Sequence, residues 1–134
     1  MKERHIRTVD SVIVFNQTLS RENLERNMAT THTWHGVSGK GYQYTVYNIN
    51  TSWNDVPGNY IYAGQTSTGW KAAYIGQTKS FKDRLPDHNE EACAKRNGAT
   101  HIHAHVNNGG EAARKAEEAD LIKKHQPPCN QQGR

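Results

Sequence analysis

Polar side chains that could act on a phosphodiester bond fall in or beside three short stretches of this chain, 57–62, 74–85 and 118–130. A phenol can orient or deprotonate water, a guanidinium can pair with a phosphate oxygen, and a carboxylate can hold a hard divalent cation. Phosphodiester hydrolysis needs these functions together in one site. The candidate residues are Tyr60, Tyr74, Lys79, Arg84, His88, Glu118 and Asn130.

Taken in order, the three stretches resemble the motifs of the GIY-YIG nuclease domain. They read PGNYIY at 57–62, YIGQTKSFKDRL at 74–85 and EADLIKKHQPPCN at 118–130. A lone Tyr-Ile-Gly carries little information, but three motifs in this order, with the spacing of Lys, Arg, Glu, Pro and Asn, form a specific signal. The resemblance implies a metal-dependent endonuclease with nucleic acid, expected to be DNA, as its partner. Such an enzyme leaves a 5′-phosphate and a 3′-hydroxyl.

The resemblance also implies roles for individual residues. Glu118 is the expected ligand of a single Mg²⁺ ion, with Mn²⁺ as a substitute, because such hard cations bind carboxylate oxygens, water and phosphate. Tyr60 and Tyr74 are expected to orient or deprotonate water, and Arg84 to pair with a non-bridging phosphate oxygen. His88 titrates near neutral pH and is the expected proton acceptor.

Two further residues are expected on the substrate side of the site. Lys79 offers a point charge near the phosphate. Asn130 resembles the family's terminal Asn and is expected to support the site rather than to react. Glu117 stands beside Glu118 in the same charged helix, and the offset to Asn130 favours Glu118 as the metal ligand.

The sequence departs from the family pattern at two positions. Asn59 stands in the middle of the first motif, and Pro86 interrupts the segment that leads to His88. Tyr62 lies on the same strand face as Tyr60 and is an alternative functional tyrosine, although packing is its expected role. The loop between the two motif tyrosines is also a few residues longer than is usual in the family.

Two other functions are compatible with the sequence. A module that binds nucleic acid without competent catalysis would keep the basic surface but would tend to lose at least one of the four residues Tyr60, Tyr74, Arg84 and Glu118. His101, His103 and His105 alternate with apolar residues, so they share one face of a strand and could bind a transition metal. That alternative predicts a metal-binding protein without nuclease activity.

The elements expected around these residues follow the order β-β-α-β-α from Gly58 onward. This order predicts an α+β fold with a small central antiparallel three-stranded sheet flanked by helices. The expected strands are 59–63, 71–75 and 101–106, and the expected helices are 80–85, restarting after Pro86 and ending near 97, and 111–125.

The organisation expected for the whole chain is one domain with short additions. The nuclease-like domain is 57–130, followed by a tail at 131–134. The N-terminal extension, 1–56, is expected to hold a short helix capped by Ser20, a loop over 31–41 and an extra strand over 42–49.

Composition sets the wider expectations. The chain has 134 residues, 34% of them hydrophobic, and a formal charge of +4, which suits a polyanionic partner. No apolar run is long enough to span a bilayer or to form a signal-peptide core, so no membrane partner is expected. Cys93 and Cys129 match no metal-binding spacing, and two reduced thiols in a cytoplasmic protein are expected.

Overall fold

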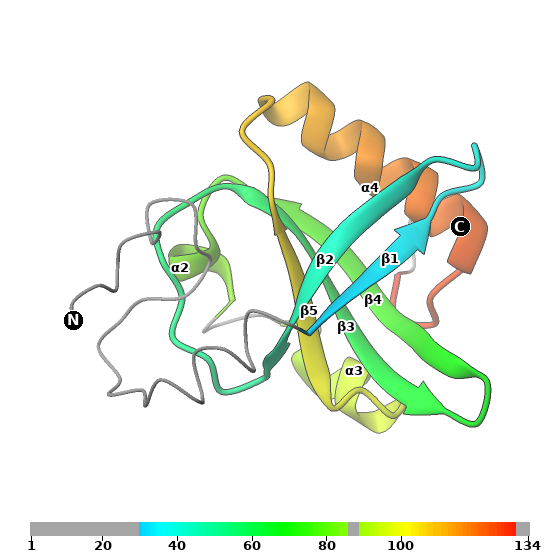
Figure 1. Cartoon of the computed structure of the whole chain (residues 1–134). Coiled ribbons are helices and arrows are strands. Elements are labelled where there is room, and N and C mark those ends of the chain that lie inside the picture. The colour runs from blue at the N-terminus through cyan, green and yellow to red at the C-terminus, as the bar shows by residue number, and fades with distance from the viewer. Residues whose placement is uncertain (1–29, 86–88, 131–134) are drawn as a thin grey trace.

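The computed structural model describes residues 30–85 and 89–130, which fold around one antiparallel sheet (Figure 1). The sheet has five strands in the order β1-β2-β5-β3-β4. The strands are β1 (Thr31–His35), β2 (Gly41–Asn48), β3 (Gly58–Thr66), β4 (Gly69–Thr78) and β5 (His101–Val106). The helices are α2 (Phe81–Arg84), α3 (Glu91–Arg96) and α4 (Glu111–His125). The α+β class is confirmed, but the sheet is larger than the three strands predicted.

Strand β1 occupies the first five residues of the loop predicted over 31–41, whereas residues 36–40 form the predicted loop. The glycines at the end of this stretch obscured the alternation before them, in which Trp34 is buried between exposed Thr33 and His35. β1 pairs with β2, so that Trp34 lies opposite Tyr42. The described part of the N-terminal extension therefore adds two strands to the sheet.

Strand β5 forms the centre of the sheet, between β2 and β3. Its apolar residues Ile102 and Ala104 pack into one cluster with Tyr60 and Phe81, on the face that α2 and α3 cover. The opposite face belongs to a second cluster with residues of α4, and the strand's histidines point to that side. The predicted alternation of His101–Val106 is confirmed.

The helices begin and end close to the predicted positions. Ser80 caps α2 by accepting a hydrogen bond from the backbone N–H of Asp83 at 3.2 Å. α4 has the predicted bounds, whereas β4 continues to Thr78 instead of ending at Gly76. The helix predicted after Ser20 lies outside the described residues. None of the described helices combines the length and apolarity needed to cross a bilayer.

The C-terminal segment, residues 126–130, runs back along the free edge of β4. The backbone N–H of Cys129 donates to the carbonyl of Ala73 at 3.0 Å. This course brings Cys129 to Cys93 on α3, and the two form a disulfide with a Cα–Cα distance of 6.0 Å. The prediction of two reduced thiols is therefore wrong, because a separation of 36 residues gave no sign that the fold would bring them together.

Candidate active site

Tyr60 projects from β3 directly opposite Gly76 of β4. Its ring is only 1% exposed and lies 6.4 Å from the ring of Phe81. A β-carbon at Gly76 would lie 2.6 Å from both Cζ and Oη of Tyr60, so the glycine leaves the space that the phenol fills. The register of β3 against β4 thus explains why the second motif needs a glycine two residues after its tyrosine.

Tyr74 lies beside Tyr60, with the two ring centres 6.2 Å apart. A register shift in the β3–β4 ladder leaves Ala73 without a partner residue, while Tyr74 lies opposite Tyr62. The bulge re-aims this part of β4, so that Ala73 and Tyr62 pack in the same cluster as Tyr60. Tyr74 is half-buried and therefore more open to solvent than Tyr60.

Tyr62 faces α3 rather than the centre of the candidate site. Its hydroxyl donates to Oε1 of Glu91 at 3.2 Å, and its side chain belongs to the core cluster. Burial, followed by the charge of Glu91, raises the pKa of Tyr62. These contacts support packing and positioning as its role, as the sequence suggested.

Arg84 brings a positive charge to the two motif tyrosines from the end of α2. Burial raises the pKa of Tyr74, while the charge of Arg84 and a hydrogen bond from it act in the opposite direction. Burial is also the main cause that raises the pKa of Tyr60, followed by Tyr74, and Arg84 again opposes the rise. Both phenols therefore remain protonated at neutral pH, and Tyr74 is the one that Arg84 stabilises more directly as a phenolate.

Glu118 completes the set from α4. Its carboxylate raises the pKa of both Tyr60 and Tyr74, so it lies within electrostatic range of the two phenols. Glu118 is half-buried, and burial raises its own pKa. Within residues 30–85 and 89–130, no side chain or backbone group makes a hydrogen bond or ion pair with this carboxylate.

The neighbouring Glu117 has a different environment. It is 5% exposed and accepts hydrogen bonds from the hydroxyl of Tyr44 at 2.6 Å, from Nδ1 of His105 at 2.9 Å and from Nδ2 of Asn107 at 3.2 Å. These donors leave little capacity for a metal ion. Glu117 therefore fixes α4 against the sheet, in an orientation that leaves the adjacent Glu118 carboxylate without a hydrogen bond from any described residue.

Asn59 belongs to the same buried network, which explains the unusual middle residue of the first motif. Its Nδ2 donates to the carbonyl of Arg114 at 2.9 Å, and its Oδ1 accepts from Asn107 at 3.1 Å. The side chain is fully buried and its amide is paired at both ends. Sequence reasoning missed Asn107 and Tyr44, because no spacing marks partners that lie on different strands.

The remaining candidates lie in different settings. Lys79 is exposed between β4 and α2, while His88 lies outside the described residues. Asn130 is 6% exposed, and its amide accepts from the N–H and donates to the carbonyl of Ile75, each at 2.8 Å. The amide of Asn130 thus holds the edge of β4 beside Tyr74 and has no free polar atom for a substrate.

Each of the three strand histidines has a polar partner among the described residues. Trp34 Nε1 donates to Nδ1 of His103 at 2.9 Å, while His105 bonds Glu117 and His101 bonds Thr100. Among the described residues, no group of three or more His, Cys, Asp or Glu side chains could hold a metal ion. Burial lowers the pKa of His103 to about 3, so this ring is neutral and belongs to the core.

A single hard cation fits the donor set around Glu118. Mg²⁺ in proteins keeps several water ligands and takes one or two carboxylates together with substrate phosphates. One half-buried carboxylate that has no hydrogen-bond partner among the described residues, within electrostatic range of two phenols, supplies that kind of site. The chemistry therefore matches Mg²⁺ or Mn²⁺ better than a metal that requires a cage of protein ligands.

Solved structures include a counterpart of this fold. The chain matches a GIY-YIG nuclease domain. The domain is the N-terminal endonuclease domain of UvrC from Thermotoga maritima, determined bound to its catalytic divalent cation, magnesium, with 27% identity and a TM-score of 0.47. That match covers 57% of this chain and 85% of the other, and a point mutant of the same domain matches with 26% identity and a TM-score of 0.47 over 57% and 84%. No protein-family model matches the sequence, and no curated protein sequence does.

Proposed function

We propose that this chain is a metal-dependent endonuclease that hydrolyses phosphodiester bonds of nucleic acid, with DNA as the substrate. The observation that carries the proposal is that the rings of Tyr60 on β3 and Tyr74 on β4 lie 6.2 Å apart, within electrostatic range of Arg84 on α2 and Glu118 on α4. Phenols, a guanidinium and a carboxylate are the groups that metal-assisted phosphodiester hydrolysis uses.

Glu118 would hold the divalent ion. A bound ion supplies positive charge to the phosphate and to the oxygen that leaves. A half-buried carboxylate that has no donor of its own among the described residues gains the most from such a partner, because burial disfavours its charged form. Glu117 beside it is already satisfied and would keep α4 in place.

Arg84 would bind a non-bridging phosphate oxygen. Its guanidinium offers a planar pair of donors, which a lysine cannot reproduce. Lys79 and Lys82 are exposed on either side of the start of α2 and would add positive charge along the path of the backbone.

The two phenols would have different roles, because they differ in solvent exposure. Tyr60 is almost fully buried and, held by Phe81 and Gly76, would donate a hydrogen bond from a fixed position. Tyr74 is half-buried and has Arg84 beside it, so it is the phenol better able to give up a proton to an acceptor. His88 remains the proposed acceptor on the basis of the sequence.

The test is cleavage of supercoiled, linear and single-stranded DNA, with RNA as a further substrate, in Mg²⁺, Mn²⁺ or EDTA. The wild-type protein should cut in either metal and not in EDTA. Glu118→Gln should still bind DNA but lose cleavage by a factor on the order of a hundred or more. Glu111→Gln is the matched control, because this exposed carboxylate lies on the same helix and the change is the same. Normal cleavage by Glu118→Gln in Mg²⁺ would refute the proposal.

A further inference from the structure

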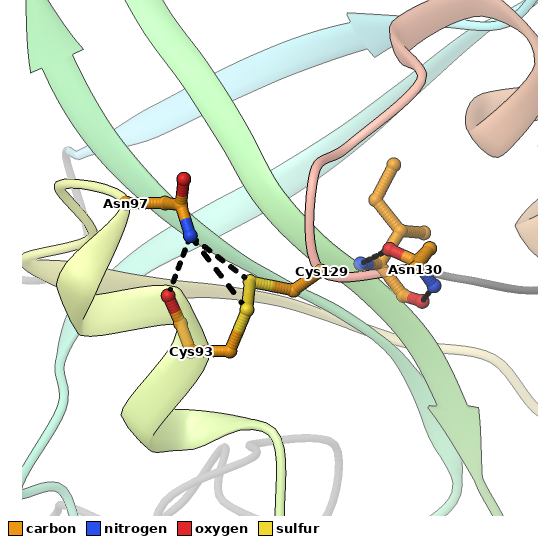
Figure 2. Close-up of a disulfide and its surroundings, with 5 residues drawn as sticks. Cys93, Asn97, Cys129 and Asn130 are labelled. Carbon is orange, nitrogen blue, oxygen red and sulfur yellow. Dashed lines mark hydrogen bonds between the residues drawn. A yellow bond between two sulfur atoms is a disulfide. The ribbon is translucent and has the colours of Figure 1, made fainter.

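The disulfide between Cys93 and Cys129 lies next to the strand that carries Tyr74. Figure 2 shows Cys93 on α3 and Asn97 at the C-cap of this helix, with Cys129 and Asn130 on the segment that passes it. The C-terminal segment contacts the backbone of β4 beside Tyr74, whereas α3 contacts the candidate site through its side chains.

The C-terminal segment holds the backbone on both sides of Tyr74. Cys129 donates its N–H to the carbonyl of Ala73, the residue before Tyr74, at 3.0 Å. Asn130 bonds both the N–H and the carbonyl of Ile75, the residue after it. Three hydrogen bonds from two consecutive residues therefore fix the edge of β4 at the position of the phenol.

Helix α3 faces the tyrosines from the other end of the disulfide. Glu91 accepts a hydrogen bond from Tyr62, and the charge of Glu90 contributes to the raised pKa of Tyr74. α3 has only six residues, has no side-chain cap at its N-terminus and buries only Ala94. A helix this short is not stable by itself in water, so its position depends on such attachments.

We propose that the Cys93–Cys129 disulfide positions Tyr74 and makes the site sensitive to redox state, so that the oxidised protein is the active form. This inference rests on the proposed function. The disulfide joins α3 to the C-terminal segment, which bonds the residues on both sides of Tyr74. When the bond opens, the C-terminal segment keeps its hydrogen bonds to β4 but loses its link to α3, and α3 loses its covalent anchor.

The chemistry of opening is thiol–disulfide exchange with a dithiol reductant. Cys93 is half-buried and Cys129 is 3% exposed, so the reductant's thiolate would attack Sγ of Cys93 and release Cys129 as a thiolate. Asn97 Nδ2 lies 3.5 Å from the Cys129 sulfur, where it can donate to that thiolate. The reductant's second thiol then displaces Cys93. The protein gains two electrons and two protons, and the dithiol becomes a disulfide.

The experiment compares oxidised and dithiol-reduced wild-type protein in Mg²⁺, using DNA cleavage. Reduction should lower kcat by roughly tenfold and leave KM nearly unchanged, because Tyr74 is displaced by a fraction of an ångström while the binding surface stays intact. Reoxidation should restore the rate. The double variant Cys93→Ser/Cys129→Ser should cleave at the reduced rate whether or not the dithiol is present. Equal rates for oxidised and reduced wild-type protein would overturn the inference.

Amide hydrogen exchange gives a readout that does not depend on activity. On reduction, the amides of Ile75 and Cys129 should exchange faster, whereas those of β2 should not change. Loss of protection throughout the sheet would show that the bond merely holds the fold together, and this would overturn the inference. A protein that shows the local exchange response but cleaves DNA in neither state would refute the nuclease function and leave the positioning of β4 supported.

Discussion

Substitution of Gly76 by alanine provides a direct test of the position of Tyr60. The new β-carbon would begin 2.6 Å from Cζ and Oη of the phenol, and ordinary contact begins near 3.4 Å, so the ring must move by about 0.8 Å. The ring of Tyr60 is 1% exposed and is packed against Phe81, which leaves little space for this movement. Overpacking of this kind costs about 1–3 kcal/mol of stability. A displacement near 1 Å within a reacting site costs on the order of a hundredfold in rate.

The assay is cleavage of supercoiled DNA at saturating Mg²⁺, with urea denaturation to measure the free energy of unfolding. Gly76→Ala should remain folded and bind DNA, while its kcat falls on the order of a hundredfold, which corresponds to about 2.7 kcal/mol of transition-state stabilisation.

The control is a double-mutant cycle with Tyr60→Phe. If Gly76→Ala acts by displacing the hydroxyl of Tyr60, the two changes together should slow cleavage little more than Tyr60→Phe alone. Fully additive losses would show that Gly76 acts through another group. Unchanged cleavage by a folded Gly76→Ala would refute the reasoning, because the hydroxyl could then be moved without effect.

Three further results are expected. Tyr60→Phe should abolish cleavage in a protein that still binds DNA, and Tyr62→Phe should cleave nearly normally; the reverse pattern in the same assay would assign catalysis to the other tyrosine. Glu117→Gln should lower the free energy of unfolding in urea by about 1–3 kcal/mol, because an amide can no longer accept all three of its hydrogen bonds; an unchanged midpoint would show that the network is unimportant. Wild-type stability should decline as the pH falls from 6.5 towards 3, because His103 binds a proton in the unfolded chain near pH 6.5 but in the folded chain only near 3. His103→Gln should make this decline shallower, and parallel curves for the two proteins would contradict the assignment.

Strongly periodic elements could be predicted from the sequence. β5 and α4 have the predicted bounds, because the strict alternation of His101–Val106 and the stop at Pro127 define these elements locally. β1 could not be recognised in the same way. Its five residues precede a glycine-rich turn, and its stability depends on pairing with β2, which is a tertiary interaction.

The candidate site likewise has some features that the local sequence predicts and others that depend on the tertiary structure. Motif order and spacing indicated Tyr60, Tyr74, Arg84 and Glu118. The structure places Tyr74, Arg84 and Glu118 within electrostatic range of Tyr60. The spacing could not show that Glu117 has three donors or that Cys129 reaches Cys93. The contacts of Glu117 and the Cys93–Cys129 pairing both depend on which elements become neighbours in the fold. A local sequence pattern does not predict those neighbours.

The central place of β5 has a consequence for synthesis of the protein. β5 is the last strand in the described part of the chain, yet it inserts between β2 and β3, so the β1–β2 and β3–β4 hairpins cannot join until the ribosome has made residue 106. Until then, each hairpin carries an unpaired edge that can attract other strands. Glu118 and Asn130 follow later still, and a nascent chain that already contains both motif tyrosines and Arg84 lacks the carboxylate of the proposed metal site. The proposed nuclease activity would thus begin only after residue 130 has been synthesised and the sheet has folded.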